Sequence, residues 1–170
     1  MEQSILINSI RAAAALAILC AASGCGDDAS DPPPNDEPPT VEEFMTGYFV
    51  TFDSYVTDDI LALYSDDVTA EISGLGQLAG KAEVRDQWLT PFTTAFPDYS
   101  HTVNELTVEG NVATADFVFR GTHQAPLLDN EPTGKELVLP IMGTYTVEES
   151  VVTHFTLEYD LAIVLAAITQ

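Results

Sequence analysis

The chain has 170 residues and a formal net charge of −22, because 27 acidic residues face only five basic ones. Such a surface excludes nucleic acid as a partner, since affinity for nucleic acid comes chiefly from Lys and Arg at phosphates. It also disfavours anionic substrates that approach from bulk solvent. Acidity for solubility explains the charge equally well, so the charge identifies no partner.

The first 24 residues are typical of a bacterial lipoprotein signal. A short apolar run, AAAALAILCAA, follows Arg11 and is too short to span a bilayer as a helix. The small residues ASG directly precede Cys25, an arrangement that resembles a lipobox with Cys25 as the acylated residue. We therefore expect an exported, lipid-anchored protein of the cell envelope. The alternative is an ordinary secretory signal with an incidental cysteine.

Residues 25–40 are expected to form a tether between anchor and domain. The stretch GDDASDPPPNDEPPT is acidic and rich in proline, so it cannot form a core and acts as a semi-extended spacer. Both cysteines of the chain, Cys20 and Cys25, lie at or before this tether. Residues 41–170 therefore form a single domain without a disulfide, a thiol nucleophile or a cysteine-based metal site.

The first half of the domain is mainly helical in pattern. A helix begins at Val41, with Thr40 and Glu43 forming a capping box. The following segments are expected to be a short helix at 57–64, a strand at 68–72, a loop at GLGQLAG and a third helix at 80–96. Pro91 is expected to bend or tighten the last part of that third helix.

The second half changes to the alternating pattern of strands. Four long runs, 99–109, 112–122, 136–147 and 151–159, read as successive strands, and an apolar helix is expected at 160–168. Gly110-Asn111 marks the first hairpin. Helices followed by antiparallel strands predict an α+β fold rather than alternating βαβ units.

Five stretches in this order resemble the SnoaL-like polyketide cyclase and ester cyclase family of the nuclear transport factor 2-like superfamily. They are LYSDDV, GKAEVRDQW, AFPDYS, VEGNVATADFVFRGTH and PTGKE, and the resemblance covers residues 41–168. It implies a cone-shaped α+β barrel in which a curved, mainly antiparallel sheet wraps the N-terminal helices around an apolar pocket. It also implies a homodimer through the outer face of the sheet. The chain departs from the family at Ala125 and Asp129, where glycines are usual.

The resemblance also implies a reaction without a metal or organic cofactor, in which an aspartate at the end of the last strand is the acid-base group. Asp160 matches that position, although an aspartate there is also a favoured N-cap of the helix that follows. Alternation along the last strand places His154, Thr156, Glu158 and Asp160 on one face, and the face that lines the pocket stays open. Glu158 is expected to be solvated.

His123 is the second candidate for chemistry. Its position beside the turn Pro132-Thr133-Gly134 favours either a structural role for the imidazole in the loop or proton transfer at the pocket rim. His101 is expected on the surface of a strand, and His154 remains undecided. The candidate pocket-lining residues are Trp88, Phe92, Phe117, Phe119 and Tyr145, for which plain core packing is the alternative.

Two functions are consistent with these residues. The first is a cofactor-independent cyclase or isomerase that acts on a hydrophobic carbonyl compound by acid-base chemistry. The second is a non-catalytic envelope lipoprotein of the same fold that binds a small apolar ligand or a partner.

The lipid anchor can be tested directly. We expect the full-length protein to partition with membranes and the Cys25→Ser variant to appear in the soluble fraction, because the variant cannot be acylated. Detergent-phase partitioning of both forms measures this. A variant that partitions like the wild type would disprove acylation at Cys25.

Overall fold

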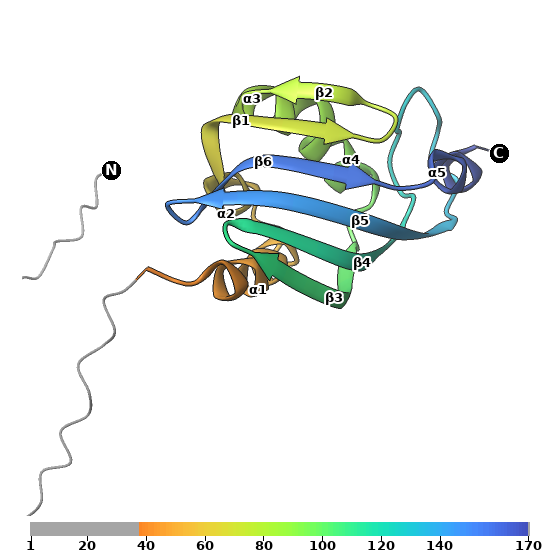
Figure 1. Cartoon of the computed structure of the whole chain (residues 1–170). Coiled ribbons are helices and arrows are strands. Elements are labelled where there is room, and N and C mark those ends of the chain that lie inside the picture. The colour runs from red at the N-terminus through yellow and green to blue at the C-terminus, as the bar shows by residue number, and fades with distance from the viewer. Residues whose placement is uncertain (1–37, 170) are drawn as a thin grey trace, which may run out of the picture. The chain divides into compact units, whose positions relative to one another are not determined.

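A single curved sheet of six strands wraps around the helices (Figure 1). The structure is a computed structural model that describes residues 38–169; the signal, Cys25 and most of the tether lie outside these residues. The strands are β1 Tyr64–Ile72, β2 Gly76–Ala79, β3 Ser100–Glu109, β4 Val112–Thr122, β5 Glu136–Glu148 and β6 Val151–Glu158. The helices are α1 Val41–Phe52, α2 Thr57–Ala62, α3 Lys81–Glu83, the π-helix η1 Val84–Leu89, α4 Thr90–Ala95 and α5 Leu161–Ile168.

The strand order is β2-β1-β6-β5-β4-β3. All neighbouring strands are antiparallel except β1 and β6, which pair in parallel. The mainly antiparallel α+β fold predicted from the sequence is therefore confirmed. The parallel pair joins the first and the last strand of the chain, because β6 lies between β1 and β5 in the sheet.

The edge strand β2 corrects the prediction of a loop at GLGQLAG. Its four residues pair with β1 through a tight turn at 73–75, and both Gly74 in this turn and Gly76 directly after it have φ of +83°. This left-handed backbone is accessible to glycine at little cost. Only Leu78 in β2 is buried, so the strand is too short and too polar to show a periodic pattern.

Most other boundaries follow the sequence. The capping box of α1 is confirmed, because the Thr40 hydroxyl accepts from the backbone N–H of Glu43 and the Glu43 carboxylate accepts from that of Thr40, at 3.2 and 2.9 Å. The second helix ends at Ala62, and β1 already begins at Tyr64, four residues before the predicted start.

The predicted third helix is divided by a π-helical segment. Pro91 lies in the first turn of α4, where proline is tolerated because the first N–H groups of an α-helix have no intrahelical acceptor. Directly before it, the N–H of Thr90 donates to the carbonyl of Arg85, five residues back. Pro91, which was expected to bend or tighten the helix, lies directly after a wider turn that contains Trp88. Such segments are rare and often occur at functional sites.

The core lies between the concave face of the sheet and the helices. It is dominated by aromatic and aliphatic side chains; apart from the tyrosine hydroxyls, His123 is the buried polar residue among those described. Between residues 38 and 169 no helix has both the length and the apolar character needed to cross a membrane.

Candidate active site

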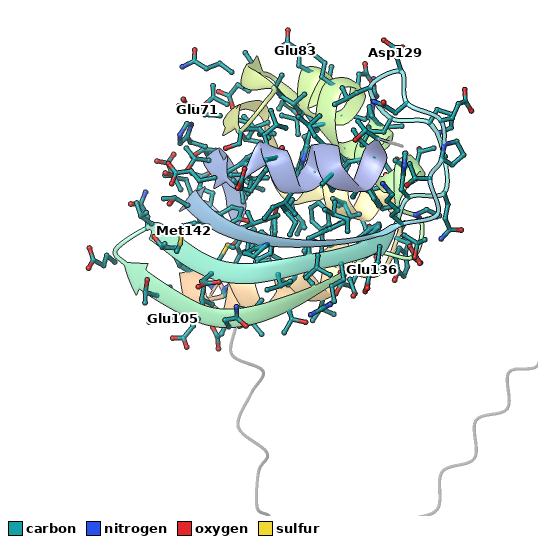
Figure 2. All side chains as sticks on the ribbon, turned by 90° about the vertical axis from the view of Figure 1, so that its right-hand side faces the viewer. Glu71, Glu83, Glu105, Asp129, Glu136 and Met142 are labelled. Atoms are coloured by element: carbon teal, nitrogen blue, oxygen red, sulfur yellow. The ribbon has the colours of Figure 1, made fainter. Side chains whose placement is uncertain are left out.

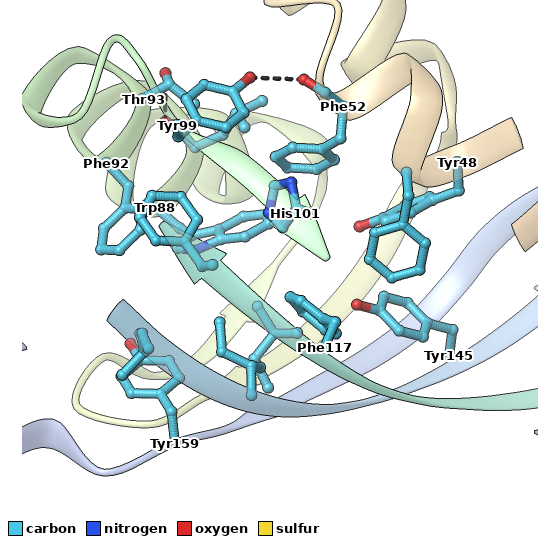
Figure 3. Close-up of a pocket in the computed structure, with 16 residues that line it drawn as sticks. Tyr48, Phe52, Trp88, Phe92, Thr93, Tyr99, His101, Phe117, Tyr145 and Tyr159 are labelled. Carbon is cyan, nitrogen blue, oxygen red and sulfur yellow. Dashed lines mark hydrogen bonds between the residues drawn. The ribbon is translucent and has the colours of Figure 1, made fainter. Parts of the chain in front are cut away.

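An apolar cavity of about 40 Å³ lies inside the curved sheet, beneath α1, η1 and α4 (Figure 3). Its walls are mostly aromatic. The five pocket residues proposed from the sequence, Trp88, Phe92, Phe117, Phe119 and Tyr145, all line it. The polar side chains in its wall are His101, Thr93 and the tyrosines Tyr48, Tyr99, Tyr145 and Tyr159.

The last strand contributes its other face to the cavity. Leu157 and Tyr159 line the cavity, and Phe155 is fully buried beside Trp88. Glu158 and Asp160 are exposed, so the acidic face of the strand points to solvent. The face of the last strand that lines the cavity is therefore the one with Leu157 and Tyr159. Glu158 is solvated, as expected.

His101 is the ionisable side chain at the centre of the cavity wall (Figure 3). Its Nδ1 lies 2.6 Å from one carboxylate oxygen of Asp53, and its backbone N–H donates to the other at 3.1 Å. Asp53 therefore holds both the ring and the backbone of His101. With Nδ1–H donating to the carboxylate, Nε2 of the neutral ring is an acceptor, and no group among residues 38–169 bonds to it.

Asp53 lies at a helix end that is unfavourable for a carboxylate. It caps the C-terminus of α1, where the helix dipole disfavours a negative charge. Two hydrogen bonds from β3 offset this cost. The same bonds connect the end of α1 to the start of β3, across 48 positions in the chain.

Aromatic rings surround the imidazole. The rings of Phe49, Phe52, Tyr99, Phe117 and Phe119 have centroids 5.3–6.0 Å from that of His101. These rings enclose the imidazole in an apolar, aromatic environment.

Tyr48, Tyr145 and Tyr159 are among the tyrosines that line the cavity, and Tyr64 contacts Tyr48 from outside the lining. The hydroxyls of Tyr48 and Tyr64 lie 2.6 Å apart, and the ring of Tyr145 is 5.2 Å from that of Tyr48. Burial raises the pKa of Tyr48, Tyr64 and Tyr145 well above the usual value. Burial also raises the pKa of Tyr159 to about 12. All four hydroxyls therefore keep their protons at neutral pH.

Gly143 makes room for Tyr145. A Cβ at position 143 would lie 2.6 Å from the Tyr145 hydroxyl, far closer than real contacts allow. The ring of Tyr145 thus extends along its own strand over the glycine and reaches the cavity. A glycine inside a strand often marks such a close approach.

Asp160 lies outside the cavity lining. Its side chain accepts from the N–H of Ala162 at 2.9 Å and caps α5. Asp160 therefore has the geometry of a helix cap, which was one of the two interpretations of this residue. Among the residues described, no side chain that lines the cavity forms a hydrogen bond with Asp160.

His123 is fully buried but also lies outside the cavity lining. Its Nδ1 accepts from the N–H of Thr133 at 3.2 Å, and the hydroxyl of Thr133 donates to the carbonyl of Ala167 in α5 at 2.6 Å. The imidazole therefore binds the loop backbone, and through Thr133 this loop holds α5.

The expectation for His101 was wrong. It was expected on the surface of a strand, and β3 is indeed mostly exposed. The N-terminal end of β3 nevertheless lies beside α1, where His101 faces inward. The sequence carries one usable signal, which is an aspartate at the unfavourable C-terminal end of an amphipathic helix.

No cluster of three or more His, Cys, Asp or Glu side chains that could hold a metal ion occurs within residues 38–169. The site is therefore described by its imidazole, its carboxylate and its tyrosines.

The curved open sheet around helices, with an apolar cavity inside it, is a nuclear transport factor 2-like cone fold. The family model of the SnoaL-like domain matches residues 41–155, and the chain belongs to this family. A comparison with curated protein sequences finds no significant match.

Solved structures with this fold include two proteins assigned as polyketide cyclases. The one from Jannaschia sp. CCS1 has a TM-score of 0.68 at 18% identity, covering 76% of this chain and 91% of its own. The one from Pseudomonas putida KT2440 has a TM-score of 0.66 at 20% identity, covering 78% and 100%. AclR of Streptomyces galilaeus, assigned as a hydroxylase, has a TM-score of 0.67 at 14% identity, covering 75% and 94%. Identities this low show the shared fold alone.

The capping role of Asp160 predicts the effect of two substitutions. Asp160→Ala is expected to lower the free energy of unfolding by about 1 kcal/mol, whereas Asp160→Asn leaves it nearly unchanged because Asn caps almost as well. Urea unfolding measures both. Equal losses in the two variants would contradict the cap.

The contact between Gly143 and Tyr145 predicts a steric effect. Gly143→Ala is expected to lower the free energy of unfolding by about 1–3 kcal/mol, because the buried ring must move. Gly47→Ala is the matched control, since a Cβ there meets nothing within 4 Å. In α1 that substitution is expected to stabilise by roughly 0.5–1 kcal/mol. A neutral Gly143→Ala would show that Tyr145 is not held in this position.

Proposed function

We propose that the cavity binds a small hydrophobic carbonyl compound and that His101 transfers a proton beside the carbonyl. The reaction is a cyclisation or isomerisation, a type that requires an acid-base group and a donor to the developing oxyanion. The observation that supports this most is the bond from Asp53 to His101 Nδ1 within an aromatic cavity.

Asp53 prepares the imidazole for this role. Its carboxylate accepts from Nδ1–H and so selects the tautomer in which Nε2 accepts a proton. When Nε2 removes a proton from carbon, the resulting imidazolium is stabilised by the carboxylate. His101 can then return the proton to another atom of the same molecule, which completes an isomerisation without a second base.

The tyrosines supply the oxyanion donor in this proposal. Tyr48 and Tyr145 line the same cavity as His101, and their raised pKa keeps their hydroxyls protonated. A protonated hydroxyl that is already desolvated stabilises a developing oxyanion strongly, because little water competes for it.

A ligand-binding function without catalysis is the second candidate. The small size of the cavity and the position of Asp160 and His123 outside its lining favour it. The two candidates differ in one respect, which is whether proton transfer depends on Nε2 of His101.

The location of this chemistry is a separate part of the proposal. The lipobox-like ASGC and the acidic tether support an exported domain anchored through Cys25 to the cell envelope. Such a domain would meet hydrophobic compounds at the membrane surface.

The test begins with a screen of polyketide-like ketoesters and other hydrophobic ketones for turnover or for exchange of the α-proton with deuterated water. His101→Asn keeps a donor toward Asp53 but removes Nε2, so we expect the rate to fall by about 10²- to 10⁴-fold. Asp53→Asn is expected to reduce the rate by a similar order, because the tautomer is no longer selected.

His154→Asn is the matched control, since His154 is exposed and bonds Thr69 away from the cavity at 2.8 Å. It is expected to leave the rate unchanged. Full activity of His101→Asn on a substrate that the wild type converts would sink the acid-base assignment, and binding without any exchange would favour the second candidate.

A further inference from the structure

A second cavity of about 200 Å³ adjoins the first and has about five times its volume. Trp88, Phe92 and Tyr159 line both cavities, so three aromatic side chains form the boundary between them. The inner cavity has room for about three water-sized groups. A ligand that places a carbonyl group beside His101 therefore needs additional space for the rest of its atoms, and the outer cavity adjoins the inner one on that side.

Exposed leucines surround the outer cavity. Leu75, Leu128 and Leu161 line it, and their exposed fractions are 38%, 56% and 38%. They come from the turn between β1 and β2, the loop between β4 and β5, and the first residue of α5, which gather at one end of the sheet (Figure 1). Figure 2 views the molecule from this end, with α5 in front and Asp129 at the tip of the loop. Apolar side chains that converge on one opening mark a site for an apolar ligand.

The backbone at Leu128 is unfavourable for leucine. Leu128 and Asp129 have φ of +49° and +61°, and they are the central residues of a tight turn closed by two hydrogen bonds of 3.0 Å between Leu127 and Asn130. Both positions of such a turn favour Asn, Asp or Gly. The left-handed backbone is strained for leucine, and the rest of the folded turn must offset this cost. The fold gains no buried core from this side chain, because most of its surface is exposed.

The charges around the outer cavity favour a neutral ligand. Its lining contains no Lys, Arg or His, and its one ionisable acid, Asp86, is paired with Arg85 at 2.7 Å. A carboxylate or phosphate on the ligand would thus be desolvated without a partner.

We propose that the outer cavity binds the apolar tail of an elongated, uncharged carbonyl compound whose carbonyl end reaches His101. The role of the carbonyl end rests on the proposed function, whereas binding of the tail does not require turnover. Leu128 determines the preference for a long tail, and Trp88, Phe92 and Tyr159 move aside to admit it. Trp88 lies in the π-helix, whose wider turn places its ring at the boundary of both cavities.

The single tryptophan of the chain reports on this site, so its fluorescence measures binding directly. The probes are methyl n-alkyl ketones from methyl propyl to methyl heptyl ketone. Affinity is expected to rise about three- to fourfold with each added methylene until the tail leaves the cavity. The n-alkanoates of equal chain length are expected to bind at least tenfold more weakly, since their carboxylate would be desolvated among aromatic rings and would face Nε2 of His101, an acceptor that cannot donate to it.

Leu128→Asn separates binding from folding. Asn tolerates the left-handed backbone, so the melting temperature should stay the same or rise, while the gain in affinity per methylene falls below about twofold. Leu165→Asn is the matched control, because Leu165 is 41% exposed on α5 but lines neither cavity. It should keep the full gain per methylene.

Affinity that does not depend on chain length, or a full gain in Leu128→Asn, would overturn the proposed tail site. Either result could occur while His101→Asn still abolishes turnover. Conversely, chain-length-dependent binding with no effect of His101→Asn on turnover would overturn the proposed reaction and leave the tail site standing.

Discussion

The hydrogen bond between Asp53 and His101 is the constraint on which the site depends. It joins the end of α1 to the start of β3 and fixes an imidazole inside an aromatic cavity, where an unpaired polar ring would be costly. Asp53 occupies a helix end that disfavours negative charge, and its bonds to His101 account for its presence there. The cavity therefore contains one group that can exchange a proton, with its tautomer determined by a neighbour that remains partly exposed to solvent.

The rest of the molecule positions donors and apolar walls around that group. Gly143 gives Tyr145 the room to reach the cavity, and burial keeps its hydroxyl protonated. The π-helix before Pro91 places Trp88 between the inner and outer cavities. His123 acts at a distance from this chemistry, because it holds the loop that, through Thr133, contacts α5. The residues suited to chemistry, His101 and Asp53, are thus distinct from His123 and Thr133, which stabilise the end of the cone.

The sequence predicts the fold well because most of its elements are specified locally. The capping box at Thr40, the alternation in β4 and the hairpin at Gly110 each arise from neighbouring residues, and each is confirmed. The strand β2 and the π-helix were not predicted, since the first depends on pairing with β1 and the second on the hydrogen bond from Thr90 to Arg85, for which the apolar pattern gives no signal. The aromatic lining followed from residue type and family resemblance. The pairing of Asp53 with His101 could not be predicted, because it joins positions far apart in the chain through the curvature of the sheet.

The central claim is that Asp53 holds His101 with its proton on Nδ1 and leaves Nε2 as the acceptor. Nitrogen-15 NMR of the histidine-labelled protein tests this without a substrate, by distinguishing the two ring nitrogens once the imidazole is neutral. The account predicts a protonated Nδ1 for His101 in the wild type and a shift toward the other tautomer in Asp53→Asn. A wild-type ring with its proton on Nε2, unchanged by Asp53→Asn, would contradict the account.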